Sequence, residues 1–136
     1  IEDETEVENM RKFGELIGMA FQIKDDLFDY GDAKVGKPTG NDIKEKKLTL
    51  PLIHILQKVP KDLKKSIIYI VKNNNNDKAK VKFVIDAVKD YGGIEYAEAK
   101  MKEYRDNALN ILHSFPDSPA REALEELVRY TTDRAY

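Results

Sequence analysis

Three carboxylates gather in residues 21–29, Phe-Gln-Ile-Lys-Asp-Asp-Leu-Phe-Asp, within an otherwise largely apolar stretch. An α-helix advances about 100° per residue, so Asp29 lies about 40° from Asp25, and Asp26 lies about 100° from it. We therefore expect Asp25, Asp26 and Asp29 to converge on one cluster of metal ions.

The repulsion within this group favours a bound cation. Carboxylates four residues apart in a helix repel one another, and beside apolar walls they take up protons unless a cation neutralises them. Lys24 points about 100° away from Asp25, so the same helix supplies no cation on the face of the carboxylates. The ligands offered are all oxygens, with no His or Cys nearby, which favours Mg²⁺ over zinc. A solvated acidic helix end is the alternative.

Two lysines follow the carboxylates in a glycine-punctuated loop. Mg²⁺ is held by one or two protein carboxylates and completes its octahedron with water and phosphate, so we expect a phosphorylated ligand. Lys37 and Lys47 are point charges that could clamp diphosphate oxygens, and Asp42 lies between them. The pattern thus predicts a magnesium-diphosphate site.

The elements that position these residues are predicted to be helices alone. Apolar residues recur at spacings of three and four through almost every segment, whereas strand signals are nearly absent. A turn is expected at the asparagine run 73–76. The expected helices cover residues 5–30, 49–58, 61–72, 77–91 with Asp77 as cap, 94–113, and a last one that begins at Ser118-Pro119.

The first helix is apolar over most of its circumference and is expected to be central. Leu16, Ala20, Ile23, Leu27 and Tyr30 fall on the side opposite Asp25 and should face a core. The side of Asp25 also carries Gln22, Gly18 and Gly14. Two glycines one turn apart leave a groove in which a chain or a partner helix can approach closely.

Composition bounds the class of protein. The 136 residues, 41% of them hydrophobic, suit one all-helical unit over residues 1–136, and no apolar run is long enough to span a membrane. The net charge of -2 makes nucleic acid an unexpected partner. The absence of cysteine fits a reducing compartment, so we expect a cytoplasmic protein.

These residues resemble the trans-isoprenyl diphosphate synthases, or polyprenyl synthetases. Residues 14–29 are similar to the second aspartate-rich motif of that family, and Gly36-Lys37, Asp42 and residues 47–51 are similar to the lysine-bearing loop that follows it. Residues 92–134 resemble its final two helices. The resemblance implies an antiparallel helical bundle, the C-terminal portion of the isoprenoid (terpenoid) synthase fold.

The resemblance also implies roles at the site. Asp25 would bind one Mg²⁺ directly, and Asp26 and Asp29 would act mainly through its waters. Lys37 and Lys47 would hold the allylic diphosphate. The other implied roles are that Gln22 orients the substrate near the reacting carbon, Phe21 lines the pocket beside isopentenyl diphosphate, and Asp42 supports the Lys37 loop.

The implied reaction is condensation of an allylic diphosphate with isopentenyl diphosphate to a trans-polyprenyl diphosphate by a homodimeric parent protein. The chain has one adjacent aspartate pair, Asp25-Asp26, and lacks the first aspartate-rich motif. We therefore expect it to be inactive alone. The alternatives are a non-catalytic partner subunit of a heteromeric prenyl synthase, a related ionising terpene synthase, or a helical interaction module.

Overall fold

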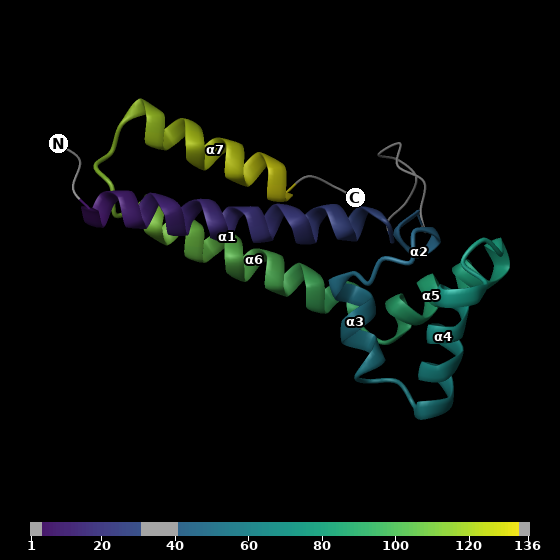
Figure 1. The fold of residues 1–136 in the computed structure, drawn as a ribbon. Helices are drawn as coiled ribbons and strands as arrows, with labels where there is room; N and C mark the ends of the chain where they lie inside the picture. Colours follow the sequence, from purple (N-terminus) through teal and green to yellow (C-terminus); the bar gives the residue numbers. More distant parts are fainter. Residues whose placement is uncertain (1–3, 31–40, 134–136) are drawn as a thin grey trace. The chain divides into compact units, whose positions relative to one another are not determined.

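The computed structural model describes residues 4–30 and 41–133, and over these residues the chain forms seven helices and no strand (Figure 1). The all-helical prediction is confirmed. The described helices are α1 (Glu4–Phe28), α2 (Asn41–Lys44), α3 (Leu50–Leu56), α4 (Lys61–Asn73), α5 (Lys78–Asp90), α6 (Gly93–Leu112) and α7 (Pro119–Asp133).

Contacts within the chain divide it into two compact units, whose boundaries fall inside α1 and α6. Of the described residues, one unit holds 4–24 and 99–133, and the other holds 25–30 and 41–98. The single unit expected over residues 1–136 stays a prediction. Within the described part of the chain, no helix has the length and apolar character needed to span a bilayer.

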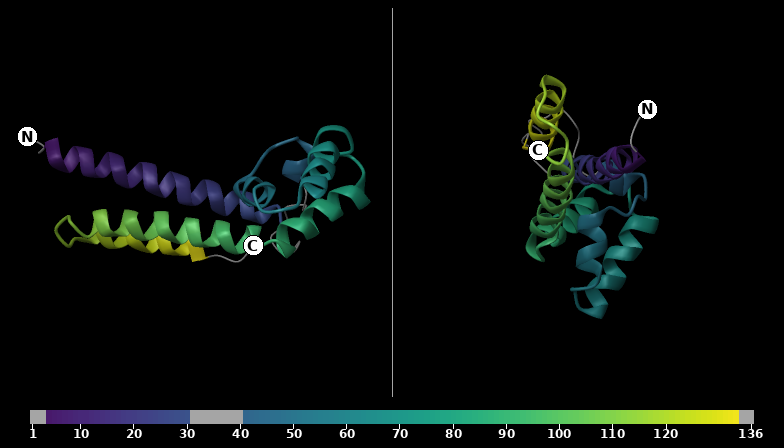
Figure 2. Two further views of the ribbon diagram at one scale, coloured as in Figure 1. Left: turned by 90° about the horizontal axis from the view of Figure 1, so that it is seen from below. Right: turned by 90° about the vertical axis from the view of Figure 1, so that its left-hand side faces the viewer.

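In the first unit, α6 runs antiparallel to α1 and α7 (Figures 1 and 2). Apolar side chains from all three helices form its core: Phe13, Ala108, Leu109, Leu112 and Val128, with Leu16, Ile17, Ile111 and Leu124 packed around them. Ser118 caps α7 as predicted, because its Oγ accepts a hydrogen bond of 3.1 Å from the N–H of Arg121, and Pro119 is the first residue of the helix.

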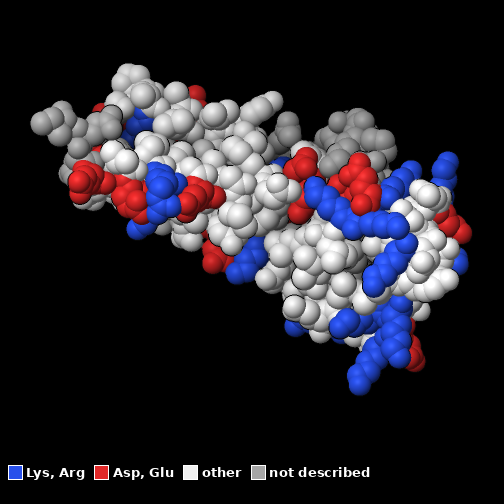
Figure 3. Space-filling view, in the orientation of Figure 1, with Lys and Arg blue, Asp and Glu red and all other residues white. Residues whose placement is uncertain are grey.

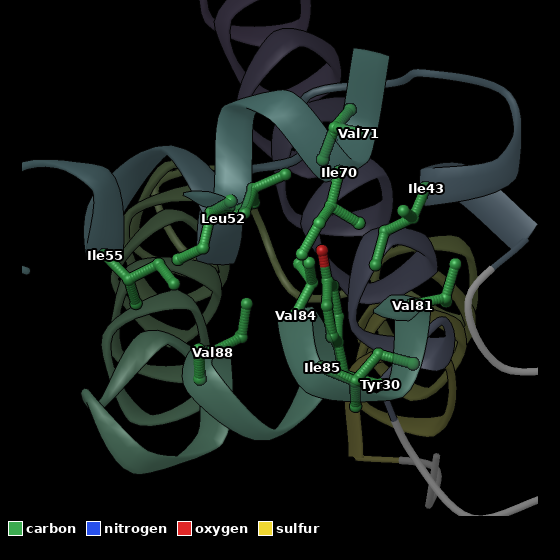
Figure 4. Packing of buried hydrophobic residues seen from close by; sticks show 12 residues of the cluster. Tyr30, Ile43, Leu52, Ile55, Ile70, Val71, Val81, Val84, Ile85 and Val88 are labelled. Carbon is green, nitrogen blue, oxygen red and sulfur yellow. The ribbon is translucent and has the colours of Figure 1, made fainter. Parts of the chain in front are cut away.

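In the second unit, α5 packs against both α3 and α4. Figure 4 shows the ring of Tyr30 among the branched side chains of this core. Its buried members are Tyr30, Ile43, Leu52, Ile55, Ile67, Ile70, Val71, Val81, Val84, Ile85, Ala87 and Val88. Helix α3 ends at Leu56, two residues before the predicted end at Lys58.

The turn between α4 and α5 is formed by the asparagine run, as the sequence predicts. Asp77 caps α5, since its Oδ1 accepts from the N–H of Ala79 at 3.0 Å and of Lys80 at 3.3 Å. Asn75 donates from Nδ2 to the carbonyl oxygen of Lys44 at 2.6 Å. The turn therefore anchors α2, which carries Asp42.

Glycine is required where α6 begins. A Cβ at Gly93 would lie 2.8 Å from the carbonyl oxygen of Pro51, 2.9 Å from Val88 Cγ1 and 3.0 Å from Ile55 Cγ2. The backbone of α6 thus touches α3 and α5 directly, and this contact positions the helix start.

Candidate functional site

The end of α1 differs from the prediction. Helix α1 ends at Phe28, and Asp29 and Tyr30 lie in a turn, so the helical angle of about 40° does not apply to Asp29. Asp25 is exposed, whereas Asp26 is 7% and Asp29 is 0% exposed. The carboxylates therefore differ in their surroundings, and Asp29 is the most deeply placed.

The structure does not bring the three carboxylates together as one set of ligands. Among the residues that it describes, no group of three or more His, Cys, Asp or Glu side chains is arranged to hold a metal ion. The metal assignments of Asp25, Asp26 and Asp29 thus stay a prediction. The expected core side of the helix is confirmed where it was assigned to Ala20, Ile23, Leu27 and Tyr30, which are all buried.

Asp29 and Asp42 are joined across the segment that separates them. The backbone N–H of Asp42 donates to Asp29 Oδ1 at 3.0 Å, and both residues are buried. A hydrogen bond to a charged acceptor is stronger than one between neutral groups. The residue at the end of α1 thereby fixes the start of α2.

The end of α2 places Lys47 back on Asp42. The N–H of Lys47 donates to the carbonyl oxygen of Asp42 at 2.8 Å, and the N–H of Lys46 donates to that of Ile43 at 2.9 Å. This pair of bonds is a Schellman motif, and Lys46 occupies its left-handed position with φ of 60°. The motif returns the chain toward its own start, where Lys47 Nζ lies 3.9 Å from Asp42 Oδ1.

The Asp42–Lys47 pair is loose enough to accept a ligand. The Lys47 side chain is 46% exposed, and its Nζ lies 3.9 Å from Asp42 Oδ1, which is long for an ion pair. Asp42 Oδ2 is buried and has no hydrogen-bond partner among the described residues. The pair therefore offers a solvent-facing ammonium, which an anionic ligand can share, and a carboxylate with one oxygen still to be satisfied.

A buried hydrogen bond lies beside these carboxylates. The hydroxyl of Tyr30 and Oγ1 of Thr49 are 2.8 Å apart. Burial raises the pKa of Tyr30 well above its usual value; the hydrogen bond to Thr49 opposes that rise, and the negative charges of Asp29, Asp42 and Asp26 add to it. The carboxylates of Asp26, Asp29 and Asp42 therefore lie close enough to the Tyr30 hydroxyl to disfavour its ionisation.

The remaining predicted site residues are placed unevenly. Phe21 is half-buried and Gln22 is exposed, three residues before Asp25 in α1. Lys37 lies outside the described residues, as do Gly36, Pro38 and Gly40. The structure therefore brings together Asp29, Asp42 and Lys47. The roles assigned to Phe21, Gln22 and Lys37 stay predictions.

Sequence reasoning gave no role to Thr49 or to Lys46. Thr49 lies in the run Lys-Leu-Thr-Leu-Pro of residues 47–51, where its polar side chain between two leucines was the available signal. Lys46 had no signal, because left-handed backbone is expected of Gly or Asn. Lys24, expected only to point away from the carboxylates, is 3% exposed.

The residues present suit a hard divalent cation. The donors at the end of α1 and start of α2 are carboxylate oxygens, the ligands that Mg²⁺ prefers, and one or two of them are sufficient. Asp25 is exposed and is thus the carboxylate that an ion can reach with its water shell intact. The burial of Asp26, Asp29 and Asp42 together gives a region in which positive charge is stabilised.

Two known proteins are similar to this chain in sequence. The "Short chain isoprenyl diphosphate synthase" of Methanocaldococcus jannaschii is 37% identical over 136 residues, which is 98% of this chain and 41% of that protein. The "Heptaprenyl diphosphate synthase component 2" of Geobacillus stearothermophilus is 33% identical over 132 residues, 96% of this chain and 40% of that protein.

A solved structure of a prenyl pyrophosphate synthase also matches the fold of this chain. The crystal structure of geranylgeranyl pyrophosphate synthase from Bacteroides thetaiotaomicron matches with a TM-score of 0.88 and 41% identity, over 98% of this chain and 44% of that one. The chain thus spans less than half the length of the relatives that it matches. Residues 1–88 match the family described as Polyprenyl synthetase. On its sequence and its fold, the chain belongs to the polyprenyl synthetase family.

Proposed function

We propose that the protein to which this chain contributes is a Mg²⁺-dependent trans-polyprenyl diphosphate synthase, a prenyltransferase that condenses an allylic diphosphate with isopentenyl diphosphate. The observation that supports it most directly is the linkage of Asp29, Asp42 and Lys47 at the end of α1. It joins buried carboxylates to a solvent-facing ammonium, as binding of a metal diphosphate requires.

Each described residue has a distinct part in this proposal. Asp25 holds a magnesium ion, with Asp26 and Asp29 acting through its waters. Lys47 donates to the allylic diphosphate and is oriented by Asp42. When bound, Mg²⁺ supplies positive charge that stabilises the departing pyrophosphate. The residues of the chain contribute by holding charge in a fixed geometry before the reaction begins.

Three further roles rest on the family alone. Gln22 orients the allylic substrate near its reacting carbon, and Phe21 lines the pocket beside isopentenyl diphosphate. Lys37 binds the same diphosphate as Lys47. The cytoplasmic location and the homodimer of the full-length protein belong to the same proposal. Product chain length is left open, since the relatives named above differ in it.

A heteromeric enzyme is the second candidate. It is favoured by the 33% identity to a protein named "component 2" of a heptaprenyl diphosphate synthase. The two candidates differ in what the purified full-length protein does alone. A homodimeric synthase elongates an allylic diphosphate without another polypeptide, whereas a component of a heteromer gains activity only when a second polypeptide is added.

The experiment measures incorporation of isopentenyl diphosphate by the full-length protein, with Mg²⁺ or with EDTA, and with Asp25→Ala or Lys47→Ala. We expect activity to need Mg²⁺ and each variant to lower kcat/KM at least about a hundredfold, because each loses transition-state charge stabilisation. The matched controls are Asp86→Ala and Lys82→Ala, an exposed ion pair of 2.9 Å on α5, and these should retain wild-type rates. Unchanged rates in both site variants would contradict the assigned roles.

A further inference from the structure

A pocket lies between α3 and α4 in the unit of residues 25–98. Its volume is about 300 Å³, at the lower end of the range of ligand pockets. The lining is apolar except at two lysines: Leu48, Leu52, Leu56, Ile67, Ile68, Val71, Lys46 and Lys72. None of these side chains belongs to the magnesium-diphosphate site proposed above.

The apolar part of the pocket is graded from floor to rim. Leu52 and Ile67 are 0% exposed and Val71 is 5% exposed, so they form a floor that water does not reach. Leu48 is 58% exposed and stands at the rim. Covering such an exposed apolar side chain with a hydrocarbon group lowers the free energy, because apolar surface is removed from water.

The charged part of the pocket is cationic and available. Among the described residues, no carboxylate lies within ion-pair distance of Lys46 or Lys72. The surrounding segment 41–90 has twelve lysines against six aspartates and glutamates, a net charge of +6 in a chain whose total is -2. Figure 3 shows lysine side chains gathered over the part of the molecule that holds α3 to α5.

The backbone of Lys46 supports a role for its side chain. Its φ of 60° puts it in the left-handed region, where glycine is the usual residue of the motif that ends α2. A lysine at this position carries a backbone penalty that glycine would avoid. Retention of such strain is a reason to look for a function of the residue, and the Lys46 side chain lines the pocket.

We propose that this pocket binds a single-chain anionic amphiphile, with its hydrocarbon chain between α3 and α4 and its carboxylate or phosphate head on Lys46 and Lys72. The small volume favours one hydrocarbon chain over the two tails of a phospholipid. The pair of ammonium groups favours an anionic head over a neutral one. Neighbouring Lys47 turns instead toward Asp42, so the two sites are separated by the direction of consecutive side chains.

The test is calorimetric titration of the full-length protein with decanoate below its micellar concentration, in EDTA so that Mg²⁺-dependent diphosphate binding is absent. We expect saturable binding of one decanoate per chain, and little binding of acetate or decanol. Lys46→Ala with Lys72→Ala should weaken binding about four- to twenty-five-fold, since each partly exposed charge contributes about two- to fivefold.

The matched control is Lys65→Ala with Lys80→Ala, which removes two lysines from another groove of the same unit, between α4 and α5. This variant should bind decanoate as the wild type does. Ile68→Phe, a substitution at a half-buried lining residue, should weaken binding by filling the pocket.

Three results would overturn the proposal. One is equal weakening by both double lysine variants, which would indicate a diffuse charge effect. Another is loss of decanoate binding in Lys47→Ala but not in Lys46→Ala with Lys72→Ala, which would place the ligand at the diphosphate site. The third is binding to vesicles of anionic phospholipid without any binding of monomeric decanoate. None of these results bears on prenyltransferase activity, so the two proposals fail independently.

Discussion

Asp29 accepts a hydrogen bond of 3.0 Å from the backbone N–H of Asp42, so a carboxylate at the end of one helix holds the first turn of the next. Both residues are buried, and the ten-residue segment 31–40 lies between them. A hydrogen bond to a charged acceptor is stronger than one between neutral groups, so this bond stabilises the start of α2 beside the end of α1. Asp29 therefore has a structural role that is separate from any role in binding a metal ion.

The two roles of Asp29 are separated by two substitutions. Asp29→Ala removes the acceptor and should lower the free energy of unfolding by about 1.5–3 kcal/mol. Asp29→Asn retains an acceptor oxygen and removes one of three buried negative charges, so its free energy of unfolding should stay within about 1 kcal/mol of wild type. Urea denaturation measures both, and equal losses in the two variants would mean that the charge, not the hydrogen bond, sets the stability.

Tyr30→Phe removes the buried hydroxyl bonded to Thr49. It should lower the free energy of unfolding at neutral pH by about 1–2 kcal/mol, because Thr49 loses a buried partner. The measurement is urea denaturation at pH 7, compared with Tyr69→Phe, a tyrosine that is 60% exposed and should show no such loss.

The same hydroxyl predicts a dependence on pH. The pKa of Tyr30 is raised in the fold, so the unfolded chain ionises first as the pH rises through about 10. The contribution of Tyr30 to stability is fully present below that pH and decreases above it. The difference in free energy of unfolding between wild type and Tyr30→Phe should thus shrink from pH 9 to pH 11, and a constant difference would contradict the raised pKa.

Gly93→Ala should destabilise the protein by about 2–3 kcal/mol. The added Cβ would meet the carbonyl oxygen of Pro51 at 2.8 Å, and backbone cannot move aside as a flexible side chain would. Thermal unfolding measures the loss. Gly14→Ala is the matched control, because outside the backbone of α1 its Cβ meets no described atom within 4 Å. A helical Gly→Ala change stabilises by about 0.5–1 kcal/mol.

Gly14 and Gly18 also test the groove predicted on the side of Asp25. Apart from the backbone of α1 itself, no atom of the described residues lies within 4 Å of a Cβ added at either glycine. If a substrate chain or a helix approaches there in the full-length protein, Gly14→Ala with Gly18→Ala should lower prenyltransferase activity while raising the temperature of unfolding. Full activity in this double variant would contradict a close approach of a substrate chain or a helix at Gly14 and Gly18.

Lys46→Gly should stabilise the protein by about 0.5–1 kcal/mol, because it relieves left-handed backbone with φ of 60°. Lys46→Ala loses the same charge but keeps a Cβ in the same backbone conformation, so it should show no gain. Urea denaturation of both variants separates backbone strain from charge.

Local sequence accounts for most helix positions. The cap at Asp77, the Ser118-Pro119 start of α7 and the asparagine turn before α5 were all predictable, since each depends on bonds between residues a few positions apart. The apolar periodicity of α1 likewise identified its buried side. The match to the polyprenyl synthetase family covers residues 1–88, a range that includes the three aspartates near the end of α1.

The site depended on contacts that no local pattern contains. Helical geometry placed Asp29 beside Asp25, whereas the chain leaves the helix after Phe28 and directs the Asp29 carboxylate to Asp42, thirteen residues later. The left-handed turn at Lys46 then returns Lys47 to Asp42. Residue types and helical periods were readable from the sequence because they express short-range bonding. The partner of each buried charge was decided only by tertiary structure, because burial compels a carboxylate to take whichever donor the packed chain brings near.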